Sequence, residues 1–246
     1  MNCRICNREC KPLFQLDNMP DRNQHLNTVP DTNGITLNVV QCEGCGLMQL
    51  DNEPVWYWQE SINSTRVSAS EVRPVDSVSF MKLEHQPSPN VYLKSIGSGS
   101  IQVPNCDKIT AYDFCIDHLM YFTAPTLRFA LENSGLFVIS MESIFNDVIL
   151  SAQVKRYERV AIYGAGHQAF AWLALHPNFE VDYIFDDNSK KQYRYSPATN
   201  IQIVAPVYVD AIIVMAGGYS DEVLKKLDDF KGGVAVLRGS HIEVIR

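Results

Sequence analysis

The fold class is decided by residues 160–187, VAIYGAGHQAFAWLALHPNFEVDYIFDD. The first four residues are an apolar run that predicts a buried strand, and Gly164-Ala-Gly166 marks a turn into an apolar helix that ends at Leu175. A second apolar run, Val181 to Phe185, predicts another strand. Strand, glycine turn, helix and strand in this order form a βαβ unit, which predicts an α/β fold with a parallel sheet.

Residues 151–246 are predicted to form one Rossmann-like domain around this unit, with a further buried parallel strand from Asp210 to Met215. The turn fits the dinucleotide fingerprint G-x-G-x-x-A, and Asp186 or Asp187 follows where a carboxylate can hold a ribose hydroxyl. Gly164, Gly166 and Asp186 are therefore cofactor-binding candidates, and NAD fits the pattern. The alternative is that the glycines only allow close packing of the helix on the strand.

Residues 61–150 are predicted to hold a linker and a shortened central region. The polar run from Glu60 to Arg73, rich in Ser, Asn and Thr, is typical of a linker. Gly135 suits the C-cap of a preceding helix. The other expected elements are a strand from Val75 to Leu83, a helical segment within Pro87 to Ile96, a turn and short strand from Gly97 to Pro104, a helix from Pro125 to Ser134 and a strand from Leu136 to Met141.

Residues 1–60 contain two C-x-x-C pairs, Cys3-Arg-Ile-Cys6 and Cys42-Glu-Gly-Cys45. Each pair can place two thiolates on one metal within a tight turn, so Cys3, Cys6, Cys42 and Cys45 predict a closed, structural zinc site. Gly44 and Gly46 suit the backbone bend around the second pair. Cys10 is the spare cysteine, and we expect a free thiol there. The alternative for the whole set is unligated buried cysteines.

Composition excludes several classes of protein. The chain has 246 residues, of which 46% are hydrophobic and 20% charged, enough to bury a core in one or two domains. Its formal net charge of -7 and the lack of a basic stripe argue against a nucleic-acid partner. The sequence shows neither a long apolar span nor a secretion signal, so we expect no membrane partner and a cytoplasmic location, where thiols favour metals over disulfides.

Read together, three stretches resemble the sugar C-methyltransferases that act on nucleotide-linked deoxysugars. This family has an N-terminal zinc domain, a central S-adenosylmethionine domain and a C-terminal Rossmann-like domain. The likeness spans most of the chain. It is carried by the two C-x-x-C pairs with Gly46-Leu-Met-Gln49-Leu, by Glu84-His85, Val103-Pro-Asn105 and Asp117-His118-Leu-Met-Tyr121-Phe122 with Leu127 and Gly135-Leu136, and by Tyr163-Gly-Ala-Gly166, Asp186-Asp-Asn-Ser-Lys-Lys191-Gln192 and Pro197.

The resemblance implies a reaction in which a base deprotonates the sugar carbon beside a keto group and the enolate takes the methyl of S-adenosylmethionine. His118 stands at the position of the family's base, and an imidazole accepts such a proton at neutral pH. Asp117, where the family usually has Glu, is expected to orient that imidazole. His85 stands at a second family position near the reacting sugar. The alternative is that both histidines are capping or surface residues.

The sequence also departs from the family. A methyl-donor site needs a strand, a glycine-rich turn and a helix, but no glycine occurs between Leu47 and Ile96. Gly97-Ser-Gly99 precedes a strand and is no replacement. Cys115 replaces a family tyrosine, and Asn146-Asp147-Val148 replaces a Gly-Gly-Ser run. These departures predict that the first half of the donor-binding domain has been lost.

Three functions remain open from the sequence. The first is a sugar C-methyltransferase-like enzyme of polysaccharide or deoxysugar biosynthesis that binds a nucleotide-sugar. The second is a non-catalytic binding or scaffold relative, partnered by a complete paralogous enzyme. The third is an NAD-dependent nucleotide-sugar oxidoreductase that uses the C-terminal fingerprint.

Overall fold

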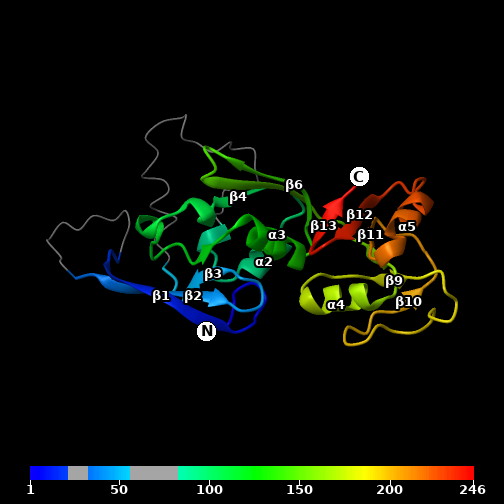
Figure 1. Ribbon diagram of the computed structural model, residues 1–246, viewed down its shortest axis with the longest axis horizontal. Helices are drawn as coiled ribbons and strands as arrows, with labels where there is room; N and C mark the ends of the chain where they lie inside the picture. The colour runs from blue at the N-terminus through cyan, green and yellow to red at the C-terminus, as the bar shows by residue number, and fades with distance from the viewer. Residues whose placement is uncertain (22–32, 56–82) are drawn as a thin grey trace. The chain divides into compact units, whose positions relative to one another are not determined.

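The computed structural model describes residues 1–21, 33–55 and 83–246 (Figure 1). These residues form two compact units. Unit 1 comprises Met1–Leu127 and Met141–Gln153, and unit 2 comprises Arg128–Ser140 and Val154–Arg246. Helices and sheets occur together, which confirms the α/β class. The predicted linker lies outside the described residues, as does the strand expected from Val75 except for Leu83.

Unit 1 begins with an antiparallel sheet of four strands in the order β1-β2-β3-β5. Leu37, Val39 and Leu50 are almost fully buried on one side of it, where they pack with Phe114 and Tyr121. This small apolar cluster holds the sheet against the chain that follows it. The strands are β1 (Cys10–Met19), β2 (Ile35–Cys42), β3 (Met48–Leu50) and β5 (Met120–Tyr121).

Short helices and a second sheet follow in the chain, and three of these elements, α3, β6 and β7, are each divided between the two units. The second sheet has three strands in the order β4-β7-β6. The helical segment expected after Pro87 is confirmed as α2, with Pro89 in its first turn, and the strand expected before Pro104 is confirmed as β4. The elements are η2 (Leu83–His85), α2 (Pro89–Lys94), β4 (Ser98–Pro104), η3 (Cys106–Lys108), η4 (Ala111–Asp113), α3 (Ala124–Asn133), β6 (Phe137–Ile144) and β7 (Ile149–Lys155).

The helix predicted from Pro125 is confirmed as α3, and Gly135 follows it with φ +82, as a C-cap requires. The turn between β6 and β7 has an unusual backbone. Phe145, Asn146 and Asp147 all have positive φ, a backbone conformation that residues other than glycine rarely adopt. The Ser143 hydroxyl donates a hydrogen bond of 2.6 Å to the Asp147 carboxylate and helps to hold this turn.

Unit 2 is built on a sheet of six strands in the order β10-β9-β8-β11-β12-β13. All neighbours are parallel except β12 and β13. The predicted βαβ unit is confirmed as β8, α4 and β9, and the strand predicted after Asp210 is confirmed as β11. The elements are β8 (Val160–Tyr163), α4 (His167–Leu175), β9 (Tyr183–Phe185), β10 (Ile203–Val204), β11 (Ala211–Val214), η5 (Gly217–Tyr219), α5 (Ser220–Lys226), β12 (Gly233–Arg238) and β13 (His241–Val244).

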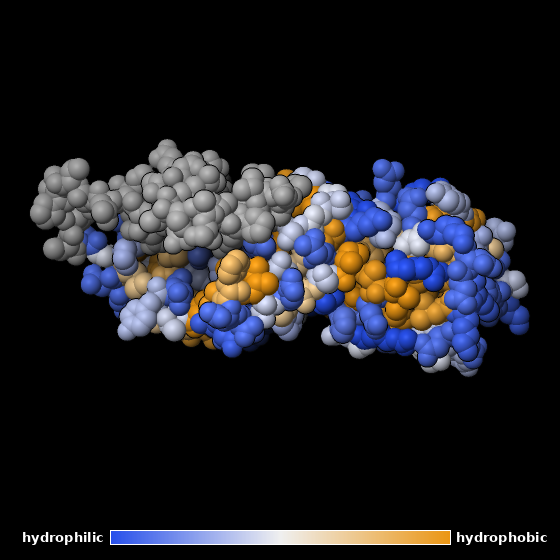
Figure 2. Space-filling model, turned by 90° about the horizontal axis from the view of Figure 1, so that it is seen from above, coloured by the Kyte–Doolittle hydropathy of each residue, from blue (hydrophilic) through white to orange (hydrophobic). Residues whose placement is uncertain are grey.

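Helices cover both faces of this sheet. Ile162, Ile184 and Ile213 are fully buried in a cluster that includes Trp172 of α4. The alternate residues of the same strands, Phe185 among them, pack in a second cluster that includes Val223 of α5. Burial on both faces explains why these strands are continuous apolar runs in the sequence. Figure 2 shows that hydrophilic residues border the apolar surface over this part of the chain.

No helix among the described residues combines the length and the apolar composition that a membrane crossing requires.

Candidate functional site

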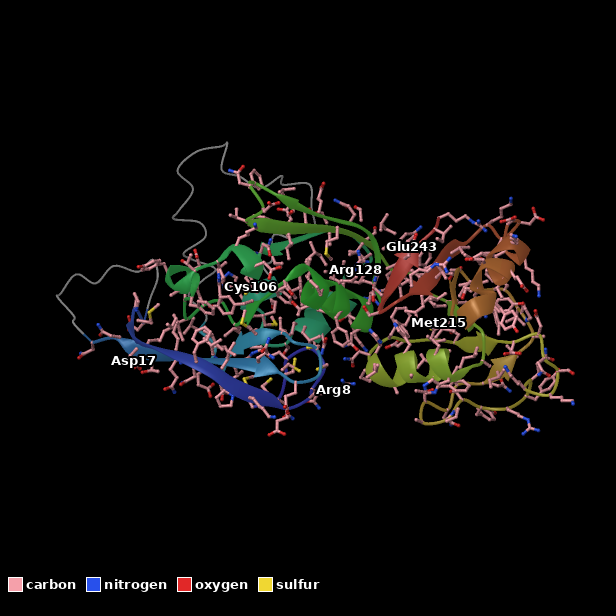
Figure 3. The ribbon with its side chains drawn as sticks, viewed as in Figure 1. Arg8, Asp17, Cys106, Arg128, Met215 and Glu243 are labelled. Carbon is pink, nitrogen blue, oxygen red and sulfur yellow. The ribbon has the colours of Figure 1, made fainter. Side chains whose placement is uncertain are left out.

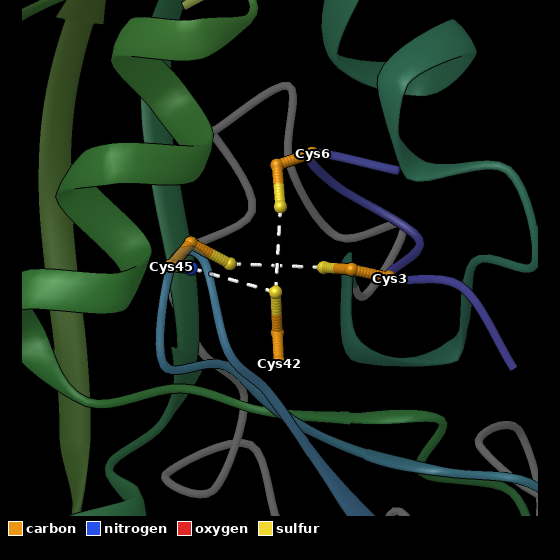
Figure 4. Close-up of side chains that lie close together, drawn as sticks. All are labelled: Cys3, Cys6, Cys42 and Cys45. Atoms are coloured by element: carbon orange, nitrogen blue, oxygen red, sulfur yellow. Dashed lines mark hydrogen bonds between the residues drawn. The ribbon is translucent and has the colours of Figure 1, made fainter. Parts of the chain in front are cut away.

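The two C-x-x-C pairs converge in unit 1 (Figure 4). The Sγ atoms of Cys3 and Cys45 lie 3.6 Å apart, and those of Cys6 and Cys42 lie 3.4 Å apart. All four sulfurs are within 4.8 Å of one another. Tetrahedral zinc with bonds of about 2.3 Å separates its sulfurs by roughly 3.8 Å, so the cluster has the spacing that a metal site needs.

Local backbone structure produces this convergence. In the first pair, the Asn7 amide donates to the Cys3 carbonyl and closes a tight turn. In the second, the amides of Gly44 and Cys45 both donate to Cys42 Sγ, which fixes the turn around this sulfur. The glycines are needed as predicted: Gly46 has φ +77, and a Cβ on Gly44 would collide with the Arg8 side chain.

The thiols share protons in a way that suits a cation. The pKa of Cys3 is lowered to about 2 because the Cys45 and Cys6 thiols donate to its sulfur. Donation to Cys3 raises the pKa of Cys6 to about 12 and also raises the pKa of Cys45. A divalent metal held by Cys3, Cys6, Cys42 and Cys45 would take the place of these protons. The donor set of four sulfurs therefore fits zinc, and it leaves no open position for a substrate.

Cys10 lies outside the cluster, as expected for the spare cysteine. It is buried, and its sulfur accepts a hydrogen bond of 3.4 Å from Gln49 Nε2. Burial raises the pKa of the Cys10 thiol to about 12. This cysteine is therefore a protonated core residue that packs beside the metal-binding turns.

The three residues proposed for catalysis come together in unit 1. His85 is in η2, and Asp117 and His118 are in the turn before β5. The imidazole rings of His85 and His118 meet edge to face with centroids 4.7 Å apart. The Leu119 amide donates to the Glu84 carbonyl at 2.8 Å and holds the two segments together. We call Glu84, His85, Cys115, Asp117 and His118 the histidine cluster.

Burial and hydrogen bonding differ among these residues. His85 and Asp117 are 2% and 8% exposed, whereas His118 is half-buried and reaches the surface. The Nδ1 atom of His85 lies 2.6 Å from the Asp117 carbonyl oxygen and 4.0 Å from its carboxylate. An oxygen of that carboxylate is within 4.8 Å of a ring nitrogen of His118. Asp117 thus contacts His85 directly and lies next to His118.

Two members of the histidine cluster were not assigned a role from the sequence. Glu84 is 1% exposed, and its carboxylate lies 4.0 Å from His85 Nε2. Cys115 offers a sulfur beside Asp117 and His118. In the sequence, the only indication of these two residues was that Glu84 is next to His85 and that Cys115 is three residues before His118.

The glycine turn of unit 2 lines a separate pocket of about 330 Å³. The pocket lies at the carboxyl ends of β8, β9 and β11, where the strand order reverses and where ligands bind in such sheets. Gly164 has φ +119, and a Cβ there would lie 2.7 Å from the carbonyl oxygen of Met215, which Figure 3 labels. Close approach of two backbones therefore requires this glycine.

Both candidate ribose carboxylates already have partners. Asp186 Oδ2 accepts from the Ala165 amide at 2.9 Å and from Lys191 Nζ at 2.8 Å. Asp187 accepts from the Tyr163 hydroxyl and from Lys226, which lowers its pKa. Asp186 is thus turned back onto the glycine loop. Its other oxygen, Oδ1, accepts from the Asn188 amide at 2.9 Å and can accept one more hydrogen bond, such as that of a ribose hydroxyl.

Residues 141–237 match the model of a family described as the C-methyltransferase C-terminal domain. The match runs from β6 to β12 and takes in the glycine turn and most of the parallel sheet. This part of the chain is therefore C-methyltransferase-like. No curated protein matches the chain.

Proposed function

We propose that this protein is a sugar C-methyltransferase-like protein that binds a nucleotide-sugar in the cytoplasm, in polysaccharide or deoxysugar biosynthesis. The observation that carries the proposal is the match of residues 141–237 to the C-methyltransferase C-terminal domain. The gathering of His85, Asp117 and His118 in one cluster supports it, because a sugar-modifying site of this kind needs a base beside polar groups.

His118 is the base in this proposal. It is half-buried, so a substrate can reach it, while His85 and Asp117 pack behind it. The imidazole takes the proton from the sugar carbon beside the ketone, and the electrons of the broken C–H bond form the enolate. Without a methyl donor, the enolate takes a proton back from the imidazole or from water. The net result is hydrogen exchange with solvent.

S-adenosylmethionine is the cofactor that the family suggests, and it would supply the methyl group. The described residues of unit 1 do not fit it, because none of their strands leads through a glycine-rich turn into a helix. The glycine turn of the described residues lies in unit 2, where Asp186 already accepts the Ala165 amide. We therefore propose that the protein binds the nucleotide-sugar, and we propose no methyl transfer.

The first test is titration calorimetry of the full chain with a thymidine diphosphate keto-deoxysugar, with thymidine diphosphate and with S-adenosylmethionine. Binding of the sugar nucleotide is expected, with weaker binding of the nucleotide alone. An absence of binding by all three compounds would remove the proposed function.

The second test separates an enzyme from a binding or scaffold protein. The same keto-deoxysugar is incubated with the protein in deuterated buffer, and deuterium beside the ketone is followed by NMR. His118→Ala should reduce exchange by 10²-fold or more, on the order of a lost general base, while the exposed His241→Ala should leave it unchanged. Binding without exchange would identify a scaffold relative, for which a paralogous enzyme is the expected partner.

A further inference from the structure

We propose that Glu84, His85 and His118 bind a divalent first-row transition metal ion, at a second site distinct from the four cysteines. One donor atom from each residue lies within 4.8 Å of the other two. Two imidazoles and one carboxylate form a known metal-binding set that leaves coordination positions open for water or substrate. The proposal stands on this geometry and does not depend on the nucleotide-sugar.

The hydrogen bond of His85 prepares its ring for a metal. A carbonyl oxygen can only accept, so the contact of 2.6 Å between His85 Nδ1 and the Asp117 oxygen places a proton on Nδ1. In the neutral ring the lone pair is then on Nε2, the atom that lies 4.0 Å from the Glu84 carboxylate. Histidine ligands generally donate their other N–H to a carbonyl or carboxylate in this way.

Glu84 supplies the second, independent observation. It is 1% exposed, and its Oε2 atom makes no hydrogen bond among residues 1–21, 33–55 and 83–246. Within the same residues no Lys or Arg forms an ion pair with it. A buried carboxylate without a cation is costly, and a metal ion provides that charge.

The contact distances allow one ion to join the three residues. Metal bonds to nitrogen and oxygen of about 2.0–2.2 Å let two ligands lie as much as roughly 4 Å apart, which matches the separation of His85 Nε2 and Glu84. The edge-to-face packing of the two imidazoles brings His118 to the same point. His118 also lies beside Cys115 and Asp117, whose sulfur and carboxylate are within 4.8 Å of one of its ring nitrogens.

Metal binding and base catalysis use the same lone pair of His118, so they exclude each other. The deuterium exchange proposed above is therefore expected from protein whose second ion has been removed, and added Zn²⁺ should inhibit it. If the exchange reaction proves absent, the metal content still tests this site, so the two proposals fail separately.

The test is the zinc content of the full chain after dialysis against a weak chelator, measured by mass spectrometry. Two zinc ions per chain are expected, one for the cysteines and one for the histidine cluster. Glu84→Gln and His85→Ala should each reduce this to about one, while His241→Ala should keep two. A content of one in the unchanged protein, or of two in both cluster variants, would overturn the proposal.

Two measurements on the unchanged protein test the same site without variants, which could fail to fold. Co²⁺ bound by four thiolates absorbs strongly in the near ultraviolet, whereas Co²⁺ bound by imidazole and carboxylate shows only weak visible bands. Titration should give both signals in separate steps. Zn²⁺ should also protect the half-buried His118 from diethyl pyrocarbonate while the exposed His241 remains reactive, and equal modification of His118 with and without Zn²⁺ would contradict the site.

Discussion

The two units are stabilised by different physical means. Unit 2 has a parallel sheet with apolar clusters on both faces, built from residues such as Ile162 and Phe185 that are fully buried. Unit 1 has smaller sheets and buries thiols, the imidazole of His85 and the carboxylate of Glu84. Burial of apolar area stabilises unit 2, whereas we propose that cations compensate the buried thiols and carboxylate of unit 1. Metal removal should therefore affect the units unequally.

The largest effect is expected from Cys42→Ser. It removes a sulfur that contacts Cys6 and that accepts two backbone amides. Structural zinc contributes on the order of 10 kcal/mol in small zinc domains, so unit 1 should lose its metal and its stable fold. Hydrogen exchange measured by mass spectrometry should show loss of protection in β1, β2 and β3, with β8 and β11 still protected.

Cys10→Ala is the matched control for Cys42→Ser. Its thiol is buried nearby but lies outside the cluster, so the variant should keep the cysteine-bound zinc. Loss of that zinc in Cys10→Ala, or retention of it in Cys42→Ser, would show that the four named cysteines are not the ligands.

A smaller loss of stability, in unit 2 instead of unit 1, is expected from Ile213→Ala. Ile213 is fully buried in β11, and the truncation leaves a cavity beneath α4. Such changes cost about 2–5 kcal/mol of unfolding free energy. Urea denaturation should show this loss in unit 2, while the zinc content of unit 1 stays unchanged. Loss of zinc in this variant would mean that the two units do not unfold separately.

The smallest effect is a pH dependence within unit 2. Glu132 is 1% exposed and accepts from the Ile242 amide, and burial raises its pKa from 4.5 to about 7. The folded state thus prefers the protonated carboxyl, whose stabilisation is complete below pH 4.5 and is lost as the pH rises through 7. Relative to Glu132→Gln, the unfolding free energy should fall by about 3 kcal/mol across this range.

Urea denaturation of both proteins at matched pH values measures this difference. Arg128, whose Nη1 lies 3.6 Å from the Glu132 carboxylate, opposes the effect and sets its size. A constant difference between the two proteins from pH 4.5 to 7.5 would show that Glu132 stays ionised in the folded state.

The sequence alone predicted the features that depend on residues close together in the chain. The strands β8 and β11 could be predicted because burial on both faces gives continuous apolar runs, and the glycine turn marks the start of α4. The meeting of four cysteines could be predicted because each C-x-x-C pair is itself a turn. Zinc itself, the roles of the catalytic candidates and the substrate stay predictions.

Contacts between distant segments could not be read in the same way. Residues of β1 are mostly exposed, so the strand lacks the alternation that reveals a half-buried strand. The pairing of Glu84 with His85 and His118 depends on how η2 packs against the turn before β5. The contacts of Asp186 with the Ala165 amide and Lys191 likewise depend on the folded loop, and its predicted role in holding a ribose stays a prediction.

Gln49 gives the metal-binding turns a support that does not depend on the metal. Its fully buried side chain accepts from the Arg4 amide at 2.9 Å and donates to Cys10, so it joins β3 to the loop that carries Cys3 and Cys6. These two hydrogen bonds hold the loop of the first cysteine pair close to the strand that follows the second pair. The loop thus has a fixed side-chain anchor on the sheet, so the first two thiols meet the other two as a consequence of the fold around Gln49.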